Sequence, residues 1–598
     1  MSTLPTRENV PTAMTWDLTT IFKTDADWEA AFLEAEQSAE TAATFQGTLA
    51  QSAETLASGL TAILTAYRQA ENVYVYASLK NDQDTANATY QGLAARAHSL
   101  LTTVSTKTAY LEPEILAIDP ATLDAWLKTP ALSVYQHYIA TLTANRDHVL
   151  GADVEALLAS AGDALNASSA TFSVLNNADI QFPTVHNDDG ETVQLSHGLY
   201  GELIKSTHRD VRKEAFESLY ATYHHLRNTF AATLAGEIKQ HTFNANAHHY
   251  ASARQAAMMA NHIPETVYDT LVATVNAHLP SLHRYLALRK RLLGLDELHM
   301  YDLYTPLNGQ PPLRYDITAA KQEALKALAP LGPDYLQHVQ AIFDQRMIDV
   351  VENQNKRSGA YSGGGYDTNP FILLNWQDSV DALYTLVHET GHSVHSWYTR
   401  HNQPYVYGDY SIFVAEIAST TNENLLTDYL LRTQADKAVR AYILNYYLDG
   451  FKGTVYRQTQ FAEFEHWLHT QDAAHEPLTA DRLSKHYAEI NARYYGAGVV
   501  QDPQIALEWT RIPHFYYNYY VYQYATGFAA ASTLATKISS GQPHAAADYL
   551  TYLKSGSSRY PIPTMQAAGV DMTKPDYLEA AFAVFDRRLD ELEALLNG

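Results

Sequence analysis

Two histidines and a glutamate stand at a spacing that can bind a metal ion on one helix. The sequence reads His388-Glu389-Thr390-Gly391-His392, the pattern H-E-x-x-H, within a segment, 378–400, whose apolar positions predict a helix. Residues four apart lie on the same helical face, so both imidazoles can reach one cation. The Glu389 carboxylate then projects toward the open side of that cation, where it could act as general base on a metal-bound water.

A bare H-E-x-x-H also occurs in unrelated proteins, so the sequence must supply a third ligand. The metzincin pattern fails, because the positions that it needs as Gly and His hold His395 and Tyr398. Glu416 follows in an otherwise apolar helical stretch, where an acidic residue needs a partner. We therefore predict one zinc ion per chain, held by His388, His392 and Glu416.

Three neighbouring residues lead to further expectations. Glu423 lies nearly on the same helical face as Glu416, so we expect it to accept the second ring N–H of a ligand histidine, although it could equally be a solvated glutamate. His395 lies about 10 Å along the helix axis from His388, too far to share one zinc, and should pack or hydrogen-bond instead. Gly391 costs about 1 kcal/mol in a helix interior, which predicts close packing against the metal face.

Composition excludes several classes of protein. The chain is 46% hydrophobic and 18% charged, which is typical of globular proteins. Its length of 598 residues predicts more than one lobe. A net charge of -25 argues against nucleic-acid binding. With no cysteine, any transition metal must be held by histidines and carboxylates. No apolar run suggests a signal peptide or a membrane span, so we expect a soluble, cytoplasmic protein without a membrane partner.

Apolar periodicity predicts a mainly helical chain with little β-structure. Long helices are expected over 52–76, 84–111, 211–244, 264–293 and 317–350. The runs 179–185 and 191–195, joined by a segment ending in Asp189-Gly190, predict a hairpin. We expect an N-terminal helical lobe over 1–110, a helical segment with the hairpin over 111–200, and a catalytic domain over 201–598.

A glycine-rich segment, 358–366, precedes a predicted strand over 370–376. It lacks the G-x-x-x-x-G-K-[ST] pattern, which excludes a phosphate loop. A strand beside the metal could align an extended peptide by β-addition, with Phe371 to Asn375 as its pairing edge. The alternative is a flexible turn followed by an ordinary strand.

Motifs spread over nearly the whole chain resemble those of the thimet-oligopeptidase group of zinc peptidases, and in particular its oligoendopeptidase F branch. The H-E-x-x-H segment with Glu416 and Glu423 is one of these motifs, and all of them occur in the family's order. These further motifs are Trp16-Asp17-Leu18, the segments 356–362 and 370–376, Arg457-Gln458, 461–465, 513–517 and 524–527.

The resemblance implies a mostly helical, multi-lobed metallopeptidase with a deep substrate channel and the zinc on its floor. It further implies a small β-sheet beside the zinc helix, endopeptidase activity on short peptides that fit the channel, and cytoplasmic peptide turnover. The oligomeric state is not predicted.

Oxyanion donors are expected in the tyrosine-rich segment near the C-terminus, because attack on a peptide carbonyl needs donors aimed at the developing charge. The resemblance implies His514 and Tyr519 in this role. The family's second tyrosine position falls on Thr526, so Tyr522 or Tyr524 must substitute for it. The remaining tyrosines of the segment are expected in the aromatic core, namely Tyr516, Tyr517 and Tyr520.

Two alternatives to an endopeptidase share parts of this pattern. A zinc carboxypeptidase or dipeptidyl carboxypeptidase of similar fold would carry the same ligands and base. A non-catalytic helical scaffold could retain a structural zinc, but such a site would close the fourth coordination position with a protein ligand.

Overall fold

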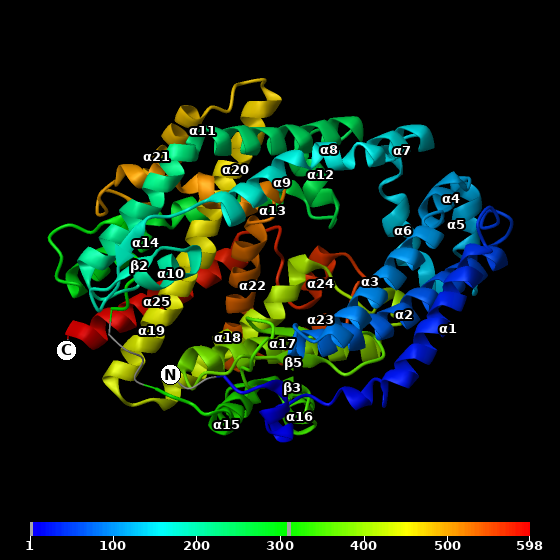
Figure 1. The fold of residues 1–598 in the computed structure, drawn as a ribbon, viewed down its shortest axis with the longest axis horizontal. Coiled ribbons are helices and arrows are strands. Elements are labelled where there is room, and N and C mark those ends of the chain that lie inside the picture. Colours follow the sequence, from blue (N-terminus) through cyan, green and yellow to red (C-terminus); the bar gives the residue numbers. More distant parts are fainter. Residues whose placement is uncertain (1–3, 308–312, 598) are drawn as a thin grey trace. The chain divides into compact units, whose positions relative to one another are not determined.

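The computed structural model describes residues 4–307 and 313–597, and it is mostly helical (Figure 1). The chain divides into two compact units, each assembled from three separate segments. Unit 1 comprises Met1–Asp147, Leu313–Tyr429 and Leu534–Gly569, and unit 2 comprises His148–Pro312, Leu430–Thr533 and Val570–Gly598. The division into 1–110, 111–200 and 201–598 that the sequence suggests stays a prediction.

Unit 1 begins with a layer of three long helices, α1 (Asp25–Ala43), α2 (Ala53–Gln83) and α3 (Ala88–Thr108), which pack on one another. Each starts at a side-chain cap, as their sequences favour. Thr24 and Asp27 form a capping box, and Ser52 and Asn87 cap the next two helices. These caps satisfy backbone N–H groups that the first helical turn leaves without partners.

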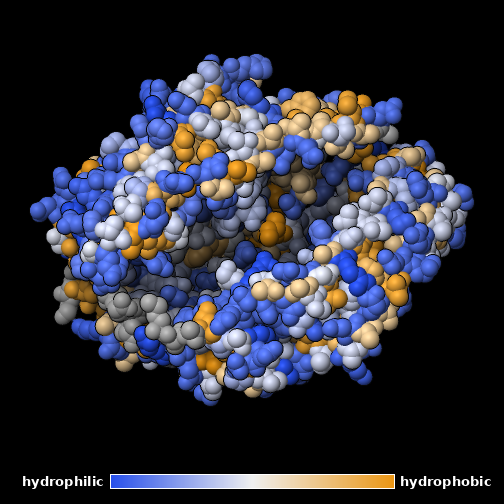
Figure 2. Space-filling model, viewed as in Figure 1, coloured by the Kyte–Doolittle hydropathy of each residue, from blue (hydrophilic) through white to orange (hydrophobic). Residues whose placement is uncertain are grey.

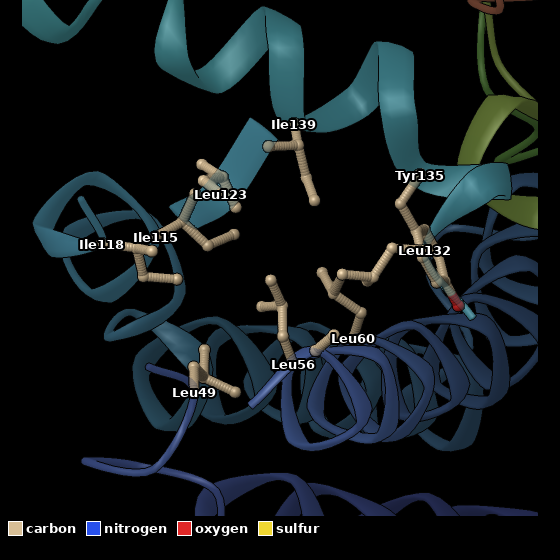
Figure 3. Close-up of a cluster of buried hydrophobic side chains, with 10 residues drawn as sticks. Leu49, Leu56, Leu60, Ile115, Ile118, Leu123, Leu132, Tyr135 and Ile139 are labelled. Carbon is tan, nitrogen blue, oxygen red and sulfur yellow. The ribbon is translucent and has the colours of Figure 1, made fainter. Parts of the chain in front are cut away.

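A second part of unit 1 packs against the beginning of α2. Leu56 and Leu60 of α2 point toward Ile115, Leu123 and Ile139, and all five side chains are buried (Figure 3). These partners come from the short helices α4 (Leu111–Ala117), α5 (Pro120–Trp126) and α6 (Gln136–Thr143). Burying a Leu or Ile side chain contributes about 1.5–3 kcal/mol, so this cluster holds the short helices on α2.

A three-stranded sheet lies in unit 1, with β3 (Ile348–Asp349), β5 (Phe371–Leu373) and β4 (Tyr361–Gly363) in that order. β5 is buried and central, parallel to β3 and antiparallel to β4. The predicted strand within 370–376 is confirmed. Its predicted role as the pairing edge for a peptide is wrong, because β3 and β4 occupy both edges of β5.

The sheet packs against α17 (Val380–Asn402), which carries the H-E-x-x-H residues, and Figure 1 shows β5 and α17 side by side. This is the predicted small sheet beside the zinc helix. The helix was expected to begin at Asp378, but Ser379 is its cap and accepts from the Ala382 N–H at 3.0 Å. The other helices of this part are α15 (Ile317–Ala327), α16 (Pro333–Asp344), α18 (Ile412–Thr433), α23 (Ala545–Leu553) and α24 (Pro561–Ala567).

Unit 2 contains the longest helix of the described chain, α11 (Arg209–Ala247), and the hairpin of β1 (Thr184–His186) and β2 (Thr192–Gln194). The hairpin confirms the prediction from its Asp-Gly turn. The other helices of unit 2 are α7 (Ala152–Ser160), α8 (Gly162–Leu165), α9 (Ala167–Val174), α10 (His197–Leu203), α12 (Ala253–Met259), α13 (Glu265–Ala277), α14 (Leu279–Leu292), α19 (Lys437–Phe451), α20 (Arg457–Ala473), α21 (Ala480–Tyr495) and α25 (Asp576–Asn597). The boundary between the units falls within α18 and α22 (Tyr522–Ser539).

Two predicted helices are each divided in the structure. The segment 264–293 forms α13 and α14, which meet at His278, two residues before Pro280. The segment 317–350 forms α15, α16 and then β3, with Gly332 at a positive φ before the Pro333 that opens α16. Proline fixes φ and lacks an N–H, so each break falls where a continuous helix would lose a hydrogen bond.

Hydrophilic residues predominate on the face shown in Figure 2, as expected for a chain with a net charge of -25. Among the described residues, no helix combines the length and hydropathy needed to cross a membrane.

Candidate metal centre

α17 and α18 bring three potential metal ligands together in unit 1. Nε2 of His388 lies 3.2 Å from Nε2 of His392, and Oε2 of Glu416 lies 3.4 and 3.5 Å from these two nitrogens. All three ligand atoms fall within 4.8 Å of one another. Two imidazoles and a carboxylate converging in this way are a donor set that suits zinc.

Gly391 permits the close approach of the two helices. A Cβ at this position would lie 2.7 Å from the Ser419 Cα and 3.1 Å from the Ala418 oxygen, both backbone atoms of α18. No side chain fits at those distances, which confirms the expectation that the glycine serves tight packing against the metal face. The contact places α18, and therefore Glu416, against the histidines of α17.

Hydrogen bonds fix the two helices in this register. The Asn422 side-chain N–H donates to the Val387 carbonyl at 3.3 Å, and Asn422 also exchanges hydrogen bonds with the buried Tyr335 hydroxyl. Within α18, the Ser419 hydroxyl donates to Oε2 of Glu416 at 3.1 Å and orients that carboxylate. Polar groups buried between helices stabilise the fold when they are paired, as these are.

Glu423 lies behind His388, as the sequence predicts. Its Oε1 is 2.5 Å from Nδ1 of His388, so Nδ1 donates to Glu423 and Nε2 faces Glu416 and His392. Burial disfavours the imidazolium, but the hydrogen bond and charge of Glu423, with Glu389 and Glu416, raise the pKa of His388 to about 9. The three carboxylates therefore favour positive charge at this position.

The pKa values of the two remaining carboxylates of the site are shifted in opposite directions. Burial raises the pKa of Glu389, against the opposing effect of the two histidines, and its side chain is only 7% exposed. Burial also opposes ionisation of Glu416, but the hydrogen bond and charge of His392, with His388, lower its pKa to about 2. Glu416 is thus a fixed anion suited to a metal, and Glu389 is a carboxylate suited to exchanging a proton.

The donor set fits a catalytic rather than a structural metal. Among the described residues, no fourth His, Asp or Glu ligand atom joins the cluster, and the chain has no cysteine. The side chains of His388, His392 and Glu416 remain 17 to 46% exposed, so solvent reaches the cluster. A structural zinc site would close that position with a protein ligand.

His395 is not part of the cluster. Its ring is 1% exposed, stacks on Tyr410 with 3.7 Å between centroids, and has a pKa well below the usual value because of burial. The prediction that it is a packing residue is confirmed.

The glycine-rich segment contributes a residue that the sequence did not single out. The Ser362 backbone on β4 hydrogen-bonds to the Glu389 carboxylate, and its hydroxyl lies 2.8 Å from that of Ser393 on α17. A short strand among glycines gives no alternating pattern, so only its position just before a predicted strand could have indicated this contact.

In unit 2, the structure brings together one pair of the predicted oxyanion donors. Nε2 of His514 lies 3.2 Å from the Tyr524 hydroxyl, and the His514 side chain is partly exposed. Tyr519 and Tyr522 are each 3% exposed, and the Tyr519 hydroxyl lies 3.0 Å from Nδ1 of His466. Tyr516 is buried as predicted, whereas Tyr517 is 54% exposed and is not a core residue.

Comparison with known protein families decides the class. The model described as "Peptidase family M3" matches residues 202–584, more than half of the chain, and the model described as "Oligopeptidase F" matches residues 114–182. The chain belongs to peptidase family M3.

Relatives of this M3 peptidase match over nearly its full length. Group B oligopeptidase PepB of Streptococcus agalactiae is 51% identical over 591 residues, which cover 99% of this chain and 98% of that protein. Oligopeptidase PepF of Bacillus subtilis is 50% identical over 594 residues, which cover 99% and 89%. The crystal structure of oligoendopeptidase-F from Enterococcus faecium is 50% identical, with a TM-score of 0.75 and coverage of 96% and 99%.

The predicted enzyme class, a metallopeptidase of the oligoendopeptidase F type, is thereby confirmed, as is the mainly helical fold. The M3 family and the His388, His392 and Glu416 cluster identify the same region of the chain, because the matched range contains all three residues.

Proposed function

We propose that this M3 peptidase is a zinc-dependent endopeptidase that hydrolyses internal bonds of short peptides. One observation carries the proposal: three ligand atoms converge beside the buried carboxylate of Glu389, and no fourth ligand joins them among the described residues. This geometry favours a hydrolase over the non-catalytic scaffold, which would need a closed site.

Zinc, when bound by His388, His392 and Glu416, would polarise the scissile carbonyl and increase the acidity of a water. Glu389 acts as general base and removes one proton from the attacking water. Its burial favours this step, because a carboxylate with a raised pKa accepts a proton more readily. Glu389 then transfers the same proton to the leaving amine as the C–N bond breaks, which regenerates the carboxylate.

The outer edge of β4 is the surface that we propose for aligning the peptide backbone. The Ile372 N–H donates to Met347 on the β3 side, so this residue does not bond to β4. Ser362 faces Ile372 in the antiparallel register, and the N–H and C=O of Ser362 therefore point away from β5 toward the outer edge. No other strand of the described residues pairs with that edge, although the Ser362 backbone hydrogen-bonds to Glu389 there, so we propose that a peptide strand adds to this edge beside Glu389.

His514 and Tyr524 are the donors that we propose for the oxyanion. Burial lowers the pKa of His514, with a contribution from the positive charge of Arg457, so the ring is neutral at pH 7 and donates one N–H. Tyr519 and Tyr522 remain alternative donors from the same segment. Both side chains are buried, so either would have to leave its present position to reach a substrate.

Short peptides as substrates are supported by the names of the relatives, oligopeptidases and oligoendopeptidases at about 50% identity. We propose a cytoplasmic location on the sequence features alone, without a nucleic-acid or membrane partner.

The decisive test is mass-spectrometric mapping of cleavage in peptides of 6 to about 20 residues with amidated C-termini, with and without a chelator. Internal cuts that disappear with the chelator are the expected result. Release of only one or two C-terminal residues, confined to peptides with a free carboxylate, would instead indicate the carboxypeptidase alternative. No cleavage in zinc-loaded protein would indicate the scaffold.

A further inference from the structure

The segment that carries the proposed oxyanion donors contains two residues in an unfavourable backbone conformation. It joins the short helix Pro513–Tyr516 to α22, and in it Asn518 and Tyr519 have φ values of 44° and 58°. Positive φ is uncommon for residues other than glycine, and a bulky aromatic residue adopts it only where its surroundings hold it there. The structure shows what holds Tyr519.

The Glu465 carboxyl group on α20 accepts the Tyr519 backbone N–H, with Oε1 at 2.5 Å. The Glu465 side chain is fully buried, and its second oxygen has no hydrogen-bond partner among the described residues. A buried carboxyl group that satisfies only one oxygen is costly to keep in a core. Its single hydrogen bond, accepted from the Tyr519 N–H, indicates a structural role for this carboxyl group.

The side chain of Tyr519 is held by the same helix. Nδ1 of His466 lies 3.0 Å from the Tyr519 hydroxyl, and the His469 ring lies 4.6 Å from the tyrosine ring. Tyr268 of α13 packs edge-on against it at 5.7 Å. Backbone and side chain of one residue are therefore both fixed by α20, through Glu465 for the backbone and through the two histidines for the ring.

We infer that Glu465 is a positioning residue, whose hydrogen bond to the Tyr519 N–H locks the segment 517–521 in the conformation that pairs His514 with Tyr524. The lock acts on the donors because the segment connects them: His514 precedes it and Tyr524 follows it, and the two side chains meet at 3.2 Å. The consequence for turnover rests on the proposed function, whereas the lock itself does not.

The protonation state of Glu465 agrees with this geometry. Burial raises its pKa to about 8, against the opposing effect of the Tyr519 hydrogen bond, so the group is a neutral acid at pH 7. The aromatic and imidazole groups that face it are neutral as well: Tyr268 from α13, Tyr519 itself, Tyr522 from α22, and His466 and His469 on α20. Arg254 of α12, which lies 5.4 Å from the Tyr268 ring, is a charged neighbour that acts on Tyr268, Tyr519 and His466. A carbonyl oxygen is then enough for the lock, and a glutamine can supply one.

The lock can be tested by hydrogen–deuterium exchange of the zinc-loaded enzyme, followed by mass spectrometry of peptides that cover 517–521. Glu465→Gln should retain the protection of the wild type, whereas Glu465→Met, which fills the same volume without an acceptor, should exchange at least tenfold faster there. Glu465→Ala serves the same purpose if the methionine variant does not fold. Unchanged protection in the variant without an acceptor would overturn the inference.

Glu463→Met is the matched control on the same helix. Glu463 bonds to Asn276, Arg493 and Tyr494 and not to the segment 517–521, so its loss should lower the melting temperature without changing exchange at 517–521. Equal acceleration in this control would show that α20 loosens generally and that Glu465 has no specific role.

Kinetics of the same variants separate positioning from a structural effect. We expect Glu465→Met to lower kcat at least tenfold with KM within threefold and one zinc per chain, and Glu465→Gln to stay within threefold of wild-type kcat. An unchanged or raised kcat in Glu465→Met would contradict the inference, as would a glutamine variant as impaired as the methionine variant. If the wild type cleaves no peptide, the proposed function fails, and the exchange experiment alone still decides the lock.

Discussion

The Nδ1 atom of His388 lies 2.5 Å from Oε1 of Glu423, and this contact orients the His388 ring within the candidate metal centre. With Nδ1 occupied, Nε2 is free to face His392 and Glu416. Glu423 stands on α18 together with Glu416, so one helix supplies both a ligand and the carboxylate behind another ligand. The relative placement of α17 and α18 therefore decides whether the site can bind a metal.

Removing the charge behind His388 should weaken metal binding. We expect Glu423→Gln to lower zinc affinity about 10- to 100-fold, because the amide oxygen can still accept from Nδ1 but no longer supplies the negative charge that increases the basicity of the ring. Competition with a chromogenic chelator measures this change. Turnover should recover at saturating zinc, and wild-type affinity in the variant would show that Glu423 has no role at the metal.

Glu389→Gln should retain zinc and lose nearly all activity. The amide has the same shape but cannot accept the proton of the attacking water, and general-base catalysis contributes about 10²- to 10⁴-fold. Elemental analysis and initial rates check the two parts. Asp381→Asn, an exposed change in the first turn of the same helix, is the control and should behave like the wild type. A glutamine variant with normal turnover would remove Glu389 from the mechanism.

Gly391→Ala should damage the metal site although alanine favours helices. The helix gains about 1 kcal/mol in propensity, but the new Cβ would lie 2.7 Å from the Ser419 Cα and must push α18 away. We expect zinc affinity to fall at least tenfold. Gly92→Ala in α3 meets no atom within 4 Å and should slightly raise the melting temperature without changing zinc binding. Equal behaviour of the two variants would refute the packing argument.

Three substitutions can distinguish which residues act as oxyanion donors. His514→Phe and Tyr524→Phe should each lower kcat about 10²- to 10³-fold with bound zinc unchanged, because each removes one donor to the developing charge. Tyr519→Phe should have a much smaller effect, since its hydroxyl is engaged with His466. A greater loss in Tyr519→Phe than in Tyr524→Phe would reverse the order in which we propose these tyrosines.

Glu465 predicts a specific dependence of stability on pH. Its pKa is about 8 in the folded protein because of burial, against an ordinary value of 4.5, so between these values the folded state holds a proton that the unfolded state has released. The contribution of Glu465 to the free energy of unfolding then falls as pH rises through this window, by up to about 1.4 kcal/mol per pH unit. The melting temperature of Glu465→Gln relative to wild type should therefore increase from pH 5 to pH 8. A constant or shrinking difference would contradict the assignment.

The cluster of His388, His392 and Glu416 was predictable from sequence because it depends on spacing within two helices. The spacing of His388 and His392 on one helix fixes their common face, and Glu416 and Glu423 are acidic residues in a stretch that is otherwise apolar. Gly391 was a useful signal for the same reason, since a glycine inside a helix needs a packing explanation. The structure confirmed the positions of these residues relative to one another.

The remaining features depend on contacts between distant segments. Nothing in the sequence around Glu465 indicates that it meets the Tyr519 backbone, because the interaction depends on a left-handed conformation that aromatic residues rarely adopt. The strand order β3-β5-β4 likewise follows from pairing and not from the β5 sequence, so the open edge was assigned to the wrong strand. Helix breaks at Pro280 and Pro333 were visible in the sequence but were outweighed by long apolar periodicity.

The most direct test of the central claim is a zinc titration of chelator-treated enzyme, with bound zinc and cleavage of a C-terminally blocked peptide measured in the same samples. We predict that internal cleavage rises in proportion to bound zinc and reaches its maximum at one zinc per chain. Cleavage that persists without metal, or zinc that binds fully without restoring cleavage, would contradict the account.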